Sequence, residues 1–144
     1  MVNKIFSNKF MDKYLLDSWS FIHFNSMFII FNILNLIFDI KKSIILSVII
    51  GISWELFENS NIGIKFWNKH NYPEYNGDSF INIIGDIIVD LLGIYIGYKI
   101  SFIQPSERLK YIICIFIILE LIPYYLSKVS IIFTLYELKH FAIL

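Results

Sequence analysis

Acidic side chains stand in stretches of this sequence that are otherwise apolar. Six of them lie within or at the edges of apolar runs: Glu55, Glu58, Asp78, Asp86, Asp90 and Glu120. No Lys or Arg lies well inside any of these runs. A carboxylate in an apolar medium costs several kcal/mol unless it is paired, hydrated or protonated. These acids are therefore protonated, line a water-filled cavity or bind a cation.

The segment 77–97, GDSFINIIGDIIVDLLGIYIG, holds three of these acids at helical spacing. At about 100° per residue, one side of a helix carries four polar residues: Asp78, Asn82, Asp86 and Asp90. Ser79, Gly93 and Gly97 fall within the same arc, and glycines four residues apart allow a neighbouring helix to approach closely. Apolar side chains occupy the other half, so we predict a helix with one acidic face and one apolar face.

Two other segments also place polar residues on one helix face. Glu55 and Glu58 are three residues apart, which puts both carboxylates on one side of a helix together with Ser47 and Gly51. Further upstream, His23 shares a face with Trp19, Ser20 and Ser26. We expect the two acidic faces to meet inside the protein, and we assign His23 to the same site.

Carboxylate and amide oxygens are the ligands that Mg²⁺ and Ca²⁺ prefer, and no thiolate or multi-histidine cluster suits zinc or copper. The predicted metal ligands are Glu55, Glu58, Asp78, Asn82, Asp86 and Asp90. Such an ion would hold a phosphate and stabilise the charge of a transfer reaction. We assign catalytic roles to His23, as general base, and to Glu58. The alternative is a hydrogen-bonded polar core that fixes helix packing.

The composition indicates the class of protein that must position these residues. The chain has 144 residues, of which 57% are hydrophobic, and its mean hydropathy is +0.65. Soluble domains are typically about 45–50% apolar. The net charge is zero, which gives no basic field for nucleic acid. We predict an all-α, multi-pass integral membrane bundle of four to five transmembrane helices around an acidic core.

Apolar runs of nearly 20 residues, the length needed to span a bilayer, divide the chain into segments. We predict one membrane domain, 1–144, with spanning helices at about 18–38, 43–59, 79–98 and 109–127. The polar stretch 60–78 is expected to be a loop. Residues 1–17 are predicted to lie at the membrane interface, and 128–144 to form a short last helix.

Three sequence stretches resemble a family of uncharacterised multi-pass membrane proteins (UPF/DUF type) related to the VanZ-like superfamily. They are DSWSFIHFNSMFIIF (17–31), SWELFENSNI (53–62) and YNGDSFINIIGD (75–86), and YELKHF (136–141) adds a weaker likeness. The resemblance points to His23, Trp54, Glu55, Glu58, Asn59, Gly77, Asp78, Ser79, Asn82 and Asp86. It implies that Asn59, Gly77 and Ser79 bind the substrate.

The order of an upstream His, the SWELFE segment and the Asp-rich helix ending in GIYIG is also similar to the base-exchange phosphatidylserine synthases, which are calcium-dependent. We therefore expect a divalent-metal-dependent enzyme, with Ca²⁺ or Mg²⁺, that acts on the head group of a phospholipid or a lipid-linked phosphate. Membrane lipids are the expected partners. Two alternatives stay open: a non-enzymatic VanZ-like protein that alters sensitivity to envelope-active compounds, and a small carrier coupled to protons or cations.

Overall fold

Helices are the regular secondary structure of the part of the chain that the structure describes. The computed structural model describes residues 14–69 and 74–127, and this part contains no strand. Its five helices are α1 (Ser20–Ile37), α2 (Ile40–Glu58), α3 (Asn61–Lys69), α4 (Phe80–Ile100) and α5 (Pro105–Ser127). The predicted all-α fold is therefore confirmed. Most of the predicted interfacial segment 1–17, and all of 128–144, lie outside the described residues.

Helix α3 lies within the stretch 60–78, which the sequence predicts to be a loop. It has only nine residues, too few to be stable alone. Gly63 and Trp67, one turn apart, are its buried residues, and the Trp67 ring packs edge-on against Trp19 at a centroid distance of 5.4 Å. Tertiary packing of one aromatic residue thus supports a helix that its polar composition does not predict.

Two of the helices, α1 and α4, are long and apolar enough to cross a membrane. Helices α2 and α5 have similar lengths, but each carries four charged residues. In α2 these residues begin and end the helix, as Lys41, Lys42, Glu55 and Glu58. By length and composition, two of the described helices could therefore cross a membrane. The predicted total of four to five transmembrane helices stays a prediction.

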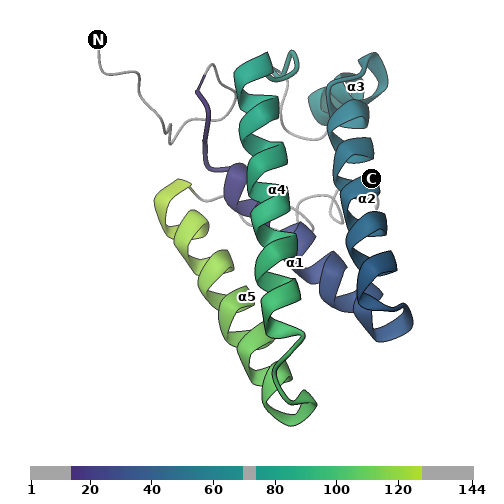
Figure 1. The fold of residues 1–144 in the computed structure, drawn as a ribbon. Helices are drawn as coiled ribbons and strands as arrows, with labels where there is room; N and C mark the ends of the chain where they lie inside the picture. Colours follow the sequence, from purple (N-terminus) through teal and green to yellow (C-terminus); the bar gives the residue numbers. More distant parts are fainter. Residues whose placement is uncertain (1–13, 70–73, 128–144) are drawn as a thin grey trace.

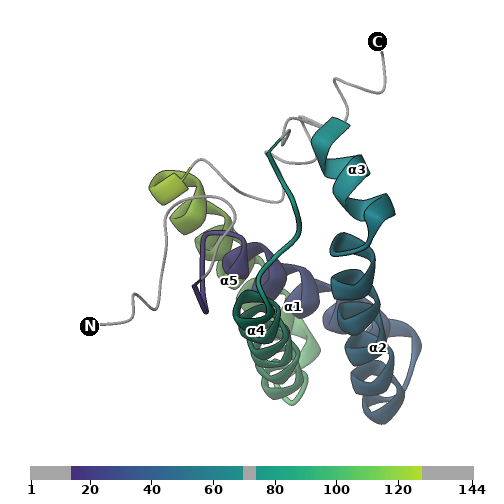
Figure 2. The ribbon, with the colours of Figure 1, turned by 90° about the horizontal axis from the view of Figure 1, so that it is seen from above.

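Helix α1 lies at the centre of the bundle. It contacts α2, α4 and α5, and its contact with α4 is the most extensive. Figure 1 shows α4 in front of α1, and the view from above in Figure 2 shows α1 between α2 and α5. Among the described residues, one apolar core cluster consists of Met27, Phe31 and Ile94, with Ile30, Ile44, Val48 and Tyr98 packed against it.

The burial pattern of α2 is the reverse of that of a soluble helix. Its buried residues are Ser43, Ser47, Gly51, Glu55 and Glu58. Its exposed apolar residues are Ile45, Ile49, Ile50, Ile52, Trp54, Leu56 and Phe57. Helix α4 follows the same rule, with Asn82, Asp86 and Asp90 inside and Ile84, Ile88 and Leu91 outside. The predicted division of both helices into a polar and an apolar face is therefore confirmed.

Polar contacts fix the remaining helices to α1. The side chain of Asn25 donates to Glu120 Oε1 of α5 at 2.7 Å, and both residues are buried. Nearer the other end of α1, Arg108 donates to Asn32 Oδ1 at 3.2 Å. The hydrogen bonds of Glu120 and Arg108 thus join α5 to α1.

At the start of α2, Asp39 accepts a hydrogen bond from the Lys42 N–H, which lowers the pKa of this exposed carboxyl.

Candidate metal centre

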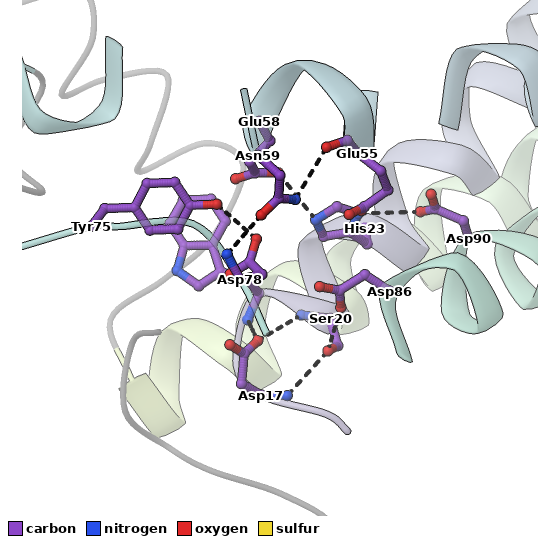
Figure 3. A network of polar contacts seen from close by, with 11 residues as sticks. Asp17, Ser20, His23, Glu55, Glu58, Asn59, Tyr75, Asp78, Asp86 and Asp90 are labelled. Carbon is purple, nitrogen blue, oxygen red and sulfur yellow. Dashed lines mark hydrogen bonds and ion pairs between the residues drawn. The ribbon is translucent and has the colours of Figure 1, made fainter. Parts of the chain in front are cut away.

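The imidazole of His23 lies between carboxylates from two other helices (Figure 3). His23 is in the first turns of α1 and is 6% exposed. Its Nδ1 is 3.2 Å from Glu55 Oε1 of α2 and 3.4 Å from Asp90 Oδ1 of α4. On the other side of the ring, Nε2 is 3.7 Å from Glu58 Oε2 of α2. Three helices therefore supply one buried cluster of an imidazole and three carboxylates.

A hydrogen-bond chain holds the start of α1 against α4. The Ser20 hydroxyl donates to Asp86 Oδ1 at 2.8 Å and accepts from the Asp17 N–H at 3.1 Å. Asp17 Oδ1 in turn accepts from the N–H groups of Trp19 and Ser20, at 2.7 and 3.2 Å. These donors have no partner within the first turn of a helix, so Asp17 satisfies them. The chain places His23, one turn further on, beside Asp90.

The segment before α4 is held by residues that the sequence predicts to bind the substrate. Gly77 has a φ of +89°, which favours glycine. Asn59 Oδ1 accepts from the Asp78 N–H at 2.6 Å, and Ser79 caps α4 by accepting from the Asn82 N–H at 3.3 Å. These contacts give Asn59, Gly77 and Ser79 a structural role beside the cluster. Their contact with a substrate stays a prediction.

A small cavity lies next to the cluster. It is lined by Asp17, Trp19, His23, Glu58, Trp67, Tyr75, Asp78, Asn82 and Asp86. It leaves about 10 Å³ for the centre of a water-sized sphere, which is room for one water or one bare ion. Tyr75 donates its hydroxyl to Asp78 Oδ2 at 2.7 Å, and burial raises the pKa of this phenol, which keeps it a donor.

The predicted metal ligands divide into two groups. Ligand atoms of His23, Glu55 and Asp90 lie within 4.8 Å of one another, close enough to share one ion. Asp78, Asn82 and Asp86 line the cavity, and Glu58 lies between the groups, lining the cavity and facing His23. All the predicted ligands therefore lie in the compact set or line the adjacent cavity. Only two of them, Glu55 and Asp90, join His23 in the compact set.

Several buried oxygens of the cluster lack well-formed hydrogen bonds. Within the described residues, both oxygens of Glu55, Oε2 of Glu58 and Oδ1 of Asp90 have no well-formed hydrogen bond, and their basic neighbour is the His23 ring, whose nitrogens lie 3.2–3.7 Å from three of them. No Lys or Arg of this part of the chain forms an ion pair with them. Buried carboxylates without donors are costly, and a divalent cation would supply the missing positive charge. The arrangement can therefore hold a metal.

Comparison with known proteins assigns the chain to a family. The family described as "Protein of unknown function (DUF2585)" matches residues 3–137. The chain belongs to the DUF2585 family. No curated protein and no solved structure matches it. The predicted membership of an uncharacterised family is confirmed, whereas the comparisons lend no support to a relationship with VanZ-like proteins or phosphatidylserine synthases.

Sequence reasoning missed three residues of this DUF2585 site. Asp17 and Ser20 support the first turn of α1, and Tyr75 holds Asp78. The helical spacing placed Ser20 on the face of His23, and Asp17 and Tyr75 begin two of the stretches that carry the family resemblance. None of the three was assigned to the site, because their contacts depend on how the chain enters α1 and α4.

Asp17 makes the stability of the DUF2585 protein depend on pH. Burial raises the pKa of its carboxyl from 3.8 to about 6, so the folded state binds this proton more tightly than the unfolded state. The stabilisation is complete below about pH 4 and is lost as the pH rises through about 6. We expect Asp17→Asn to become more stable relative to wild type by about 3 kcal/mol between pH 4 and pH 7.

Unfolding measured from pH 4 to pH 7.5 in detergent tests this prediction. Asp39→Asn is the control, because hydrogen bonds from Lys42 lower the pKa of the Asp39 carboxyl, so any pH dependence from this group has the opposite sign. Relative to wild type, Asp39→Asn is therefore not expected to gain stability as the pH rises. A constant difference for Asp17→Asn would contradict the prediction.

Proposed function

We propose that this DUF2585 member is a multi-pass membrane protein that binds a divalent cation and acts on a phosphate head group, either of a phospholipid or of a lipid-linked phosphate. The observation that carries the proposal is the convergence of His23, Glu55 and Asp90 from three helices, where one imidazole is the basic neighbour of several buried carboxylate oxygens. A polar core that only fixed helix packing would be expected to satisfy these oxygens internally.

The outer surface supports a place in the membrane. Apolar side chains cover the outside of α2, α4 and α5, whereas the acidic side chains of α2 and α4 are buried. Exposed apolar surface of this extent marks contact with lipid or with another protein. The charges of α2 fall at its two ends or on its buried face, which is compatible with a third crossing. In α5 the charges likewise lie near its start, apart from the buried Glu120, so we take α5 as the fourth crossing.

The position of the cluster suits a reaction on a head group. Asp86 and Asp90 lie about 9 and 15 Å along α4 from its start, and Glu55 and Glu58 are in the last turn of α2. Trp54, with 40% of its surface exposed, lies on the same turn of α2, and Trp favours the membrane interface. A phosphate at the interface would therefore reach a metal held in this half of the membrane.

The geometry suggests separate roles for the two sides of the imidazole. Nδ1 faces Glu55 and Asp90 and would join them as a metal ligand. Nε2 faces Glu58, which would orient the ring as a carboxylate commonly does for a metal-bound histidine. Because Glu58 also lines the cavity, we assign to its carboxylate the transfer of a proton during the proposed reaction. The metal would polarise the phosphate, and a general-base role for His23 stays a prediction.

Titration with Ca²⁺, Mg²⁺ and Mn²⁺ tests the metal site. We expect the purified protein to gain about 2.7 kcal/mol of stability at an ion concentration of 100 times Kd. Glu55→Gln and Asp90→Asn should lose this gain. Glu120→Gln is the matched control, because Glu120 is equally buried but contacts Asn25 on the side of α5. A wild-type protein that no divalent ion stabilises would refute the metal site.

The reaction is tested separately, with phosphatidic acid and an isoprenoid phosphate as substrates. Release or exchange of the head group should require the ion and should be lost in Glu58→Gln. Ion binding without turnover of either substrate would leave the metal site intact and contradict the enzymatic part of the proposal.

A further inference from the structure

A second and much larger pocket ends at the same histidine. It lies between α1 and α2 and leaves about 240 Å³ for the centres of water-sized spheres. Its lining residues are Trp19, Ile22, His23, Ser26, Met27, Ile30, Ile50, Trp54 and Asp90. Two of the three candidate metal ligands, His23 and Asp90, therefore also line this pocket. The remainder of its wall is almost entirely apolar.

The pocket leads from the level of the metal ligands towards the middle of α1. Trp19 and Ile30 mark its extent on α1, which corresponds to about 16 Å along the helix axis. On α2 its wall is formed by Ile50 and Trp54, which are 39% and 40% exposed. These two residues stand on the apolar outer face of α2, so the pocket opens sideways to the surface that we assign to lipid.

We propose that this pocket binds one hydrocarbon chain of the lipid whose phosphate lies at the metal centre. The occupant follows from the lining, which is apolar along its length and polar only where His23, Asp90 and Ser26 lie. Met27 adds a flexible side chain that adapts to an irregular ligand. The position of the head group rests on the proposed function, whereas binding of the chain rests on the pocket alone.

This arrangement specifies a substrate class. A soluble phosphate ester would leave the apolar wall of the pocket unfilled, while a lipid would bury part of one chain there. Each buried methylene contributes about 0.8 kcal/mol, so the pocket would favour a phosphate that carries a long chain. A lateral opening also lets the lipid enter from the bilayer without leaving it.

Photolabelling tests the pocket directly. The probe is phosphatidic acid with a diazirine in one acyl chain, present at low mole fraction in phosphatidylcholine nanodiscs that hold the full chain. We expect cross-links at Met27 and Ile30 to exceed those at Ile117 and Leu121, which are exposed on α5. Labelling that is no stronger in the pocket than on α5 would overturn the proposal.

A pair of adjacent variants supplies the control. Ile50→Trp fills the mouth of the pocket, and Ile49→Trp places the same side chain on the outer face of α2, where Ile49 is 53% exposed. Exclusion of two methylenes corresponds to about a tenfold loss of binding, so Ile50→Trp should reduce pocket labelling by about that factor. Both positions are exposed enough to accept tryptophan without unfolding. Equal labelling in the two variants would refute the pocket.

Parallel samples with EDTA and with Ca²⁺ separate this inference from the metal site. Pocket labelling in both samples supports the chain-binding role even where Ca²⁺ gives no stabilisation. Stabilisation by Ca²⁺ without pocket labelling in either sample overturns the inference and leaves the metal centre standing.

Discussion

Replacement of His23 by alanine is expected to abolish divalent-cation binding and to destabilise the protein by about 3–5 kcal/mol. The imidazole is the one basic group that contacts Glu55, Glu58 and Asp90 within the described residues. Its loss leaves three buried carboxylates facing a cavity. Loss of a residue that only orients a ligand costs about 10- to 100-fold in metal affinity, so loss of a ligand should cost at least about 100-fold.

Calorimetric titration with Ca²⁺ and thermal unfolding with and without the ion measure the two effects of His23→Ala. Asn25→Ala is the matched control, because Asn25 is also buried on α1 but donates to Glu120 of α5. It should reduce stability by about 1–3 kcal/mol and leave the Ca²⁺ affinity unchanged. Equal Ca²⁺ affinities in wild type and His23→Ala would show that the imidazole is not a ligand.

The affinity of wild type for Ca²⁺ should also fall as the pH is lowered, because the ligands must lose their protons to bind the ion. This dependence should be weaker in His23→Ala wherever binding can still be measured. The comparison separates a direct ligand from a residue that only supports the fold.

The positions and faces of the long helices could be predicted from the sequence. The four apolar windows agree with α1, α2, α4 and α5 to within about four residues, because apolar runs and turn residues are local signals. The buried faces of α2 and α4 followed from the 100° rotation per residue. Helix α3 was missed because its support is the packing of Trp67 against Trp19, a contact between residues distant in sequence.

The division of the acids into a compact set and a cavity lining could not be predicted in this way. The spacing of Asp78, Asn82, Asp86 and Asp90 gives them one face but not the depth at which α2 meets that face. Depth is set by the register between helices. The structure places His23 level with Asp90, so Asp78 at the start of the run faces Tyr75 and Asn59.

The register between α1 and α4 depends on glycines, and replacement of Gly93 by alanine should disrupt it. A Cβ at Gly93 would overlap the carbonyl oxygen of Phe24 and lie 3.0 Å from the Phe28 nitrogen. Both are backbone atoms of α1, so relief requires the helices to separate. Overpacking of this kind costs about 1–3 kcal/mol or more, although alanine is intrinsically better than glycine in a helix by about 1 kcal/mol.

The same separation should weaken the metal centre, because Gly93 is three residues from Asp90 and Phe24 adjoins His23. We therefore expect Gly93→Ala to lower the midpoint of thermal unfolding and the Ca²⁺ affinity together. Gly97→Ala is the matched control. Its Cβ would lie 2.6 Å from Phe31 Cδ1 and 3.1 Å from Asn32 Nδ2, which are side-chain atoms and not the backbone of α1.

Gly97 is also about 10 Å further along α4 than Asp90, so Gly97→Ala should cost less stability and leave Ca²⁺ affinity near that of wild type. If the two variants matched each other in both measurements, the close approach at Gly93 would not be what aligns His23 with Asp90. A selective loss of affinity in Gly93→Ala would instead show that a residue with no side chain, two turns inside an apolar helix, sets the geometry of the acidic cluster.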